Sequence, residues 1–187
     1  MDNWHDNRDG NYGYAWSHQN SPARRAHDGV DIFPFDRSAL PPVYAPFAAQ
    51  VVDVNVGGQR VRDDSLAPNW DYGQGNIYGN YVWLRSTEAD ASKGFLAFYC
   101  HLQDDPTLRS LTGALVTSIA EGGTLLVDHK TQVGMMGDTG NAANDPQLHM
   151  EIHYPRGITF TCARCTRTKD GMTAINPFPS LSNPRPR

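Results

Sequence analysis

Short runs of β-branched and aromatic residues, separated by Gly, Pro, Asn and Asp, recur along the sequence, and helical periodicity is scarce. Partial alternation of apolar and polar side chains over residues 51–56 and 81–85 is typical of half-buried antiparallel strands. One helix is expected within residues 105–120, where Pro106 suits a first turn. We expect strands at residues 43–44, 48–56, 79–86, 94–102, 123–127, 132–136 and 148–154. The predicted fold is mainly β: an antiparallel sheet or open β-sandwich with long loops and little helix.

The length of 187 residues predicts one domain with short appendages. Residues 1–26 form a polar and aromatic N-terminal extension, residues 27–155 the main domain, and residues 156–187 a wrapped C-terminal tail. Residues 57–78 are expected to be a long loop, and loops of that length are usually functional or disordered. We expect this loop to form one wall of a substrate cleft through its aromatic and amide side chains, Trp70, Tyr72, Asn76 and Tyr78.

The charge distribution and hydropathy exclude two classes of protein. The net charge is −4, and residues 1–154 carry 10 Lys and Arg against 19 Asp and Glu, so the acidic body argues against a nucleic-acid partner. Residues 155–187 carry 6 Lys and Arg against 1 Asp, and this basic segment indicates either a solvated terminus or a contact with an anionic polymer such as cell-wall glycan. No apolar run approaches the ~18–20 residues of a membrane helix, so we expect no membrane span. The polar start lacks the apolar region of a signal peptide, and a leader that was cleaved or left out remains open.

The three cysteines do not predict a structural zinc site. Cys162 and Cys165 form a CxxC, but no second pair of ligands follows it. A local disulfide and two free thiols both remain open for this pair. Cys100 is interpreted as a core residue, because strand alternation points it away from the side that His101 faces.

Polar residues at alternate positions of the last predicted strand share one face, about 6.8 Å apart for neighbours i and i+2. They are Gln147, His149, Glu151 and His153, opposite the apolar Leu148, Met150 and Ile152. Such a polar side of a strand is expected to face either solvent or a polar cleft.

A second polar cluster, HDGVD, contains His27 and Asp31 with Gly29 between them, and glycine permits a bend that brings the two side chains together. Two imidazoles and one carboxylate are a common ligand set for catalytic zinc, with the fourth position left for water. His27, Asp31 and His149 fit that set. The alternative for His27 and Asp31 is an ordinary surface pair.

His101 ends a hydrophobic strand in FYCHL, and its alternative interpretation is a partly buried histidine bonded to the backbone. The run GMMGDTG is interpreted as a strand and a tight turn, because it lacks the lysine of a phosphate-binding loop.

Six ordered motifs resemble the M23 (lysostaphin/LytM-type) zinc metallopeptidases: HDGVDI, VYAPFAAQVVDV, GNYVWLRS, FYCHL, VGMMGDTGN and PQLHMEIH. The resemblance covers about residues 25–155 and implies that the main domain is an M23-like peptidase domain. The sequence NPFP at residues 176–179 is similar to the family's closing turn. It implies the M23 type of β-fold, with one zinc ion per chain in a groove on the sheet. It also implies hydrolysis of peptide bonds in peptidoglycan stems or cross-bridges, and therefore a place in the periplasm, the cell wall or outside the cell.

The resemblance assigns roles to five positions of this sequence. His27 and Asp31 match the family's HxxxD zinc ligands, and His149 matches the second histidine of its HxH, the third ligand. His101 matches a catalytic histidine beside the metal. The other catalytic histidine, the first of HxH, is replaced here by Gln147, while Pro146, Leu148 and Glu151 keep the surrounding register.

The replacement by Gln147 leaves more than one function open. A positioned proton-transfer group contributes ~10²–10⁴ in rate, which a glutamine cannot supply, although its amide can still donate a hydrogen bond to an oxyanion. We therefore expect a zinc-dependent peptidoglycan endopeptidase with modified or reduced catalysis. The alternative is a catalytically impaired domain that binds cell wall or a partner hydrolase; a structural domain of a phage tail or secretion apparatus is a third interpretation. We expect a monomer, and a protein inhibitor or activator is left open as a partner.

Overall fold

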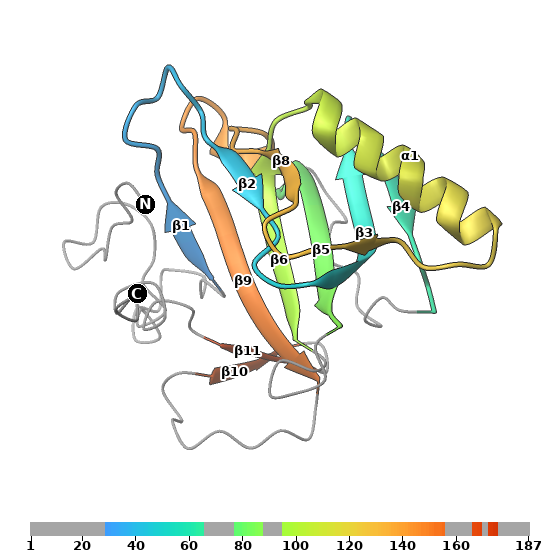
Figure 1. Cartoon of the computed structure of the whole chain (residues 1–187). Coiled ribbons are helices and arrows are strands. Elements are labelled where there is room, and N and C mark those ends of the chain that lie inside the picture. The colour runs from blue at the N-terminus through green and yellow to red at the C-terminus, as the bar shows by residue number, and fades with distance from the viewer. Residues whose placement is uncertain (1–28, 66–76, 88–94, 156–165, 170–171, 176–187) are drawn as a thin grey trace.

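A computed structural model describes residues 29–65, 77–87, 95–155, 166–169 and 172–175 of the chain. Its described part contains a nine-stranded antiparallel sheet, in which seven strands follow the order β10-β11-β9-β6-β5-β3-β4 (Figure 1). The other two strands are β1, which pairs with β9, and β7, which pairs with β3. Strand β1 pairs with residues 148–150 of β9, and β11 pairs with the residues 152–155 that follow. The nine strands are β1 (Val30–Ile32), β3 (Ala49–Val56), β4 (Gln59–Arg62), β5 (Asn80–Ser86), β6 (Leu96–Leu102), β7 (Leu126–Val127), β9 (Leu148–Pro155), β10 (Thr166–Lys169) and β11 (Met172–Ile175).

A second layer covers one face of this sheet. It consists of the helix α1 (Pro106–Ala120) and a two-stranded sheet of β2 (Pro42–Tyr44) and β8 (Gln132–Met135) (Figure 1). The short 3-10 helix η1 (Gly140–Ala142) follows β8. The α1 residues Leu108, Leu111 and Leu115 recur at helical spacing and are buried against the sheet. Because they pack with valines of β3 and β5, the main hydrophobic core lies between the two layers.

Aromatic residues gather on the opposite face of the sheet. The rings of Trp83 on β5 and Phe98 on β6 stack with their centroids 4.4 Å apart, and both side chains are fully buried. Tyr81 and Cys100 belong to the same buried cluster. The polar side chains of β9 that point to this face therefore lie next to buried aromatic residues.

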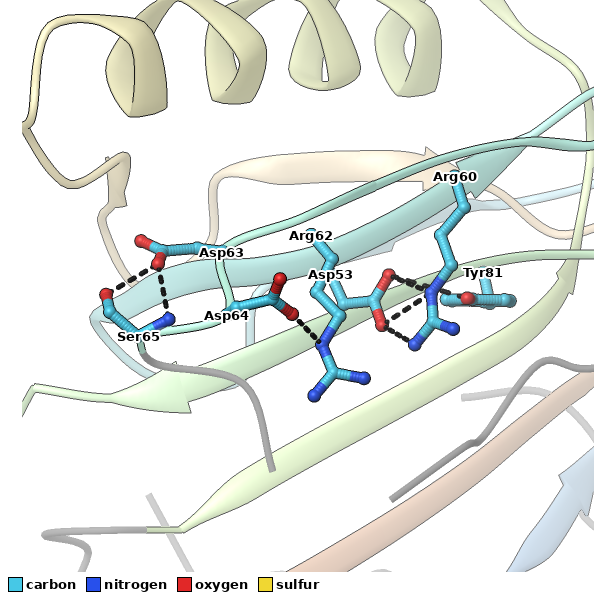
Figure 2. A network of polar contacts seen from close by, with 7 residues as sticks. All are labelled: Asp53, Arg60, Arg62, Asp63, Asp64, Ser65 and Tyr81. Atoms are coloured by element: carbon cyan, nitrogen blue, oxygen red, sulfur yellow. Dashed lines mark hydrogen bonds and ion pairs between the residues drawn. The ribbon is translucent and has the colours of Figure 1, made fainter. Parts of the chain in front are cut away.

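A polar network lies at the β4 edge of that face (Figure 2). The Asp53 carboxylate on β3 accepts hydrogen bonds from the Arg60 guanidinium on β4 and from the Tyr81 hydroxyl on β5. Burial raises the pKa of Asp53 above its ordinary value, although the hydrogen bonds from Arg60 act in the opposite direction. Beyond it, Arg62 pairs with Asp64. The network ties β4 to the sheet and lies three strands away from β9.

The mainly β fold expected from the sequence is confirmed, and so is its single helix, which is the only α-helix in the described residues. The expected loop at residues 57–78 is wrong in part, because residues 59–62 form β4 and pair with β3. Four residues were too few, and too strongly charged, to stand out as a strand before their pairing partner was known. In the tail, β10 and β11 extend the large sheet from β9.

Several predictions on organisation lie outside the described residues. They concern residues 1–26, the CxxC of Cys162 and Cys165, and the turn at residues 176–179. The division of the chain into three segments stays a prediction. In the described part of the chain, no helix combines the length and the apolar character needed to cross a bilayer.

The N-cap of α1 gives a prediction on stability. Asp105 is buried, its Oδ1 accepts a hydrogen bond from the Thr107 backbone N–H, and its Oδ2 accepts one from Met135 on β8. Asp105→Ala removes both and is expected to lower the free energy of unfolding by about 2 kcal/mol, measured by urea denaturation. Asp104→Ala, which removes only an exposed ion pair with Arg109, is the control and should change stability little. Equal effects of the two substitutions would contradict the capping role.

Candidate active site

Two strands far apart in the sequence bring Asp31 and His149 together. In the antiparallel pair of β1 and β9, Asp31 lies directly opposite His149, and the Oδ1 and Nδ1 atoms of their side chains are 2.8 Å apart. Just before β1, Gly29 makes the close approach possible, because a Cβ there would lie 2.4 Å from the Met150 carbonyl oxygen. The bend expected to bring His27 to Asp31 lies outside the described residues, as does His27 itself.

His149 is buried and has a carboxylate on each side of its ring. Its Nδ1 faces Asp31, and its Nε2 lies 2.8 Å from Oε1 of Glu151. Burial alone would lower the pKa of His149, but the hydrogen bonds to the two carboxylates and their negative charges outweigh it and raise the pKa to about 10. In the metal-free chain the ring is therefore held as a cation at a position where two anions attract positive charge.

An irregularity in β6 brings His101 close to His149. Leu102 pairs with Asn80 and Cys100 with Tyr81, so that His101 is an extra residue in the ladder, a β-bulge. Its φ of 62° lies in the left-handed region, which is uncommon for residues other than glycine. The ring of His101 lies with its centroid 6.0 Å from that of His149.

A hydrogen bond to the backbone assigns the tautomer of His101. Its Nδ1 lies 2.9 Å from the carbonyl oxygen of Thr139. A carbonyl oxygen only accepts, so Nδ1 carries the hydrogen, and in the neutral ring the basic lone pair is on Nε2. The Thr139 hydroxyl in turn donates to the Leu102 carbonyl and accepts from the Asn80 N–H, which fixes the turn against the bulge. Nothing in the sequence singled out Thr139, because these bonds depend on contacts between distant segments.

The bulge corrects one expectation about Cys100. Regular alternation was expected to point Cys100 away from the side that His101 faces. Cys100 is instead in the aromatic cluster, opposite His149 in the β6–β9 ladder, and the bulge brings the ring of His101 close to His149 as well. Its interpretation as a core residue holds, because the thiol is fully buried and burial raises its pKa well above the ordinary value. A thiol in that state is a poor nucleophile.

Gln147 lies directly before β9, two residues from His149. Its backbone N–H donates to the Gly137 carbonyl at a distance of 2.9 Å, and the residue is half-buried. This bond joins the start of β9 to the GDTG turn that also contacts His101. The backbone at Gln147 is thus anchored beside the residues expected to form the site.

The pair of Asp31 and His149 offers donors that suit zinc. One carboxylate oxygen and one imidazole nitrogen are directed at one another, and both types are common zinc ligands. Within the described ranges no three His, Cys, Asp or Glu side chains are arranged to hold a metal ion. A third protein ligand would have to come from residues outside those ranges, where the predicted ligand His27 lies. The predicted roles of His27, Asp31, His149, His101 and Gln147 stay predictions.

The two-sided pattern expected for β9 is present in the structure. Leu148, Met150 and Ile152 contact the main core, whereas His149, Glu151 and His153 are buried on the opposite side. Glu151 and His153 were not among the predicted site residues, although their alternate spacing with His149 was a usable signal. Of the predicted cleft wall, Trp70, Tyr72 and Asn76 lie outside the described residues. Tyr78 contacts Phe98 on the His149 side of the sheet, with ring centroids 5.4 Å apart.

Comparison with solved structures relates this arrangement to known folds. The structure of LytU matches with a TM-score of 0.50 and 17% identity, over 97% of this chain and 91% of that one. The chain has an M23-type fold. The antimicrobial peptidase lysostaphin from Staphylococcus simulans matches at 0.49 and 20% identity, over 92% of this chain. The catalytic domain of the prophage-encoded M23 protein EnpA from Enterococcus faecalis matches at 0.48 and 16%, over 88% of this chain and 86% of that one.

The chain is shorter than some of the proteins that it resembles. It spans 48% of the lysostaphin chain and 32% of a zinc-containing peptidase from Vibrio cholerae. No protein-family model and no curated protein matches the sequence. At these identities the likeness concerns the fold, and the chemistry rests on this chain's own side chains.

Proposed function

We propose that this chain is a zinc-dependent endopeptidase that hydrolyses peptide bonds in the stems or cross-bridges of peptidoglycan. The observation that carries the proposal is the facing pair of Asp31 and His149, with His101 beside it on a peptidase-type fold. Asp31 and His149 would hold the zinc together with His27. A substrate of this kind places the reaction in the periplasm, the cell wall or outside the cell.

The residues around Asp31 and His149 would have different roles in the hydrolysis. Zinc, when bound, lowers the pKa of a water molecule and polarises the scissile carbonyl. His101 holds Nδ1–H against the Thr139 carbonyl and so presents Nε2 as the atom that takes a proton from the attacking water. Gln147 neither takes up nor releases a proton at neutral pH. Its side-chain amide can donate a hydrogen bond to the oxyanion, which would preserve part of the stabilisation that a histidine gives.

The direct test is digestion of purified peptidoglycan, followed by mass analysis of the soluble peptides. We expect peptide release that a chelator abolishes and that added zinc restores. The masses of the products identify the bond that is cut. Release that persists unchanged in the chelator would contradict a zinc-dependent reaction.

A second candidate function follows from Gln147. Because the position expected to hold a catalytic histidine holds an amide, the chain could use the same site to bind cell wall or a partner hydrolase without cleavage. Zinc binding without peptide release by the parent chain would favour this function. Release by the parent chain would exclude it.

Substitution of Gln147 by histidine separates these functions. We expect Gln147→His to raise turnover by ~10–10³, within the range for one acid–base group, and to add a loss of activity at high pH as the new imidazolium deprotonates. The measurement is the pH dependence of peptide release at constant zinc concentration. If the parent is inactive at every pH and the variant is active, the chain is a binding domain. If the parent is active and the variant is slower, the amide is an adapted part of the site.

A further inference from the structure

Glu151 lies between two buried histidines on one face of β9. Its Oε1 is 2.8 Å from Nε2 of His149, and its Oε2 is 2.5 Å from Nε2 of His153. The exposed fractions are 5% for His149, 2% for Glu151 and 0% for His153, so all three side chains are shielded from solvent. A charge at this depth must be satisfied by hydrogen bonds. The three residues therefore form a continuous chain that ends at the Asp31 pair.

The direction of the hydrogen bonds follows from the partners of Glu151. Each of its two carboxylate oxygens lies within hydrogen-bond distance of one imidazole Nε2, that of His149 or that of His153. A carboxylate oxygen accepts hydrogen bonds, so both Nε2 atoms donate. With Nε2 of His149 committed to Glu151, Nδ1 is the nitrogen directed at Asp31.

His153 is well placed to keep Glu151 in this orientation. Its ring centroid lies 5.3 Å from that of Trp83, and its backbone pairs with Leu96 on one side and Ala174 on the other. Because β9 is paired along both edges there, the backbone of His153 is held in place, and its ring is fully buried beside Trp83. The orientation of the Glu151 carboxylate is thereby fixed from the side away from Asp31.

We propose that Glu151 and His153 are positioning residues, which hold Nδ1 of His149 toward Asp31 and so set the affinity of the chain for zinc. This inference rests on the proposed function, because it takes Asp31 and His149 as zinc ligands. Partners that hydrogen-bond to a ligating histidine typically change metal affinity 10–100-fold when they are replaced. His153 acts one step further from the metal, through Glu151, and its contribution should be smaller.

The test is the dissociation constant for zinc, measured by competition with a chromophoric chelator. We expect Glu151→Gln to weaken binding by about 10–100-fold, because the amide keeps the shape of the side chain but not its negative charge. His153→Leu should weaken it by about 10-fold. His153→Gln should bind nearly as well as the parent, because a glutamine N–H can still donate to Glu151. This recovery by a second donor distinguishes positioning from simple packing.

Two further measurements complete the test. Cys100→Ala, which changes a buried neighbour opposite His149 without touching the hydrogen-bonded chain, is the control and should keep the parent affinity. In the zinc-loaded parent, imidazole nitrogen–proton correlations by NMR should show the hydrogen of His149 on Nε2. Circular dichroism of each metal-free variant verifies folding, and if Glu151→Gln does not fold, the comparison of His153→Leu with His153→Gln decides.

The outcomes separate this inference from the function on which it rests. A parent that binds no zinc overturns both. A parent that binds zinc, with Glu151→Gln and His153→Leu binding equally well, overturns the positioning role and leaves the proposed function standing. Equal losses in His153→Leu and His153→Gln would also overturn it, because only packing would then be involved.

Discussion

Replacing His101 by alanine should lower peptide release from peptidoglycan by ~10²–10⁴, the usual contribution of one positioned proton-transfer group. The reason is the assigned tautomer: Nδ1–H is bonded to the Thr139 carbonyl, so Nε2 is the basic atom that is lost. The measurement is the initial rate of peptide release at constant zinc concentration. His129→Ala, which removes an exposed histidine away from the site, should leave the rate unchanged.

The same position gives a matched comparison of stability. His101 has a φ of 62°, which costs an alanine about 1 kcal/mol but is readily adopted by glycine. His101→Gly should therefore be as inactive as His101→Ala but more stable by about 1 kcal/mol in urea denaturation. If His101→Ala releases peptides as fast as the parent, His101 is not the general base. If the glycine variant is the less stable of the two, the bulge is not strained as we describe it.

Loss of the metal is the second large effect that we expect. Protein purified without chelator should contain about one zinc per chain by elemental analysis, and His149→Ala, Asp31→Ala and His27→Ala should each lose most of it. A ligand present at about a thousand times its Kd stabilises the folded chain by about 4 kcal/mol. Chelation should therefore lower the Tm of the parent by roughly 8–16 °C and leave that of His149→Ala almost unchanged.

Two results would show that the site is misassigned. One is a His149→Ala variant that keeps its full zinc content. The other is a parent whose Tm falls in the chelator by no more than that of the variant. His129→Ala serves again as the control, because it removes a histidine without removing a predicted ligand.

Local patterns in the sequence predicted much of the fold. The β-branched runs and the punctuating Gly, Pro and Asn residues located seven of the strands, and Pro106 marked the start of α1. These signals come from residues close together in the chain. The alternation in β9 predicted which side of that strand carries His149, Glu151 and His153. Strand β4 was missed, because four residues that include two arginines have no strong strand pattern without their partner β3.

The sequence by itself determined which polar residues this chain offers for chemistry and on which face of β9 they lie. Only the tertiary structure decided how they meet. Asp31 faces His149 because β1 pairs with β9 across 118 positions of the chain, and His101 comes close to His149 because a bulge breaks the alternation of β6. Glu151 keeps its charge because two histidines bond to it inside the sheet. Pairing register, bulges and the balance of burial against hydrogen bonding depend on contacts between distant segments, which local patterns do not contain.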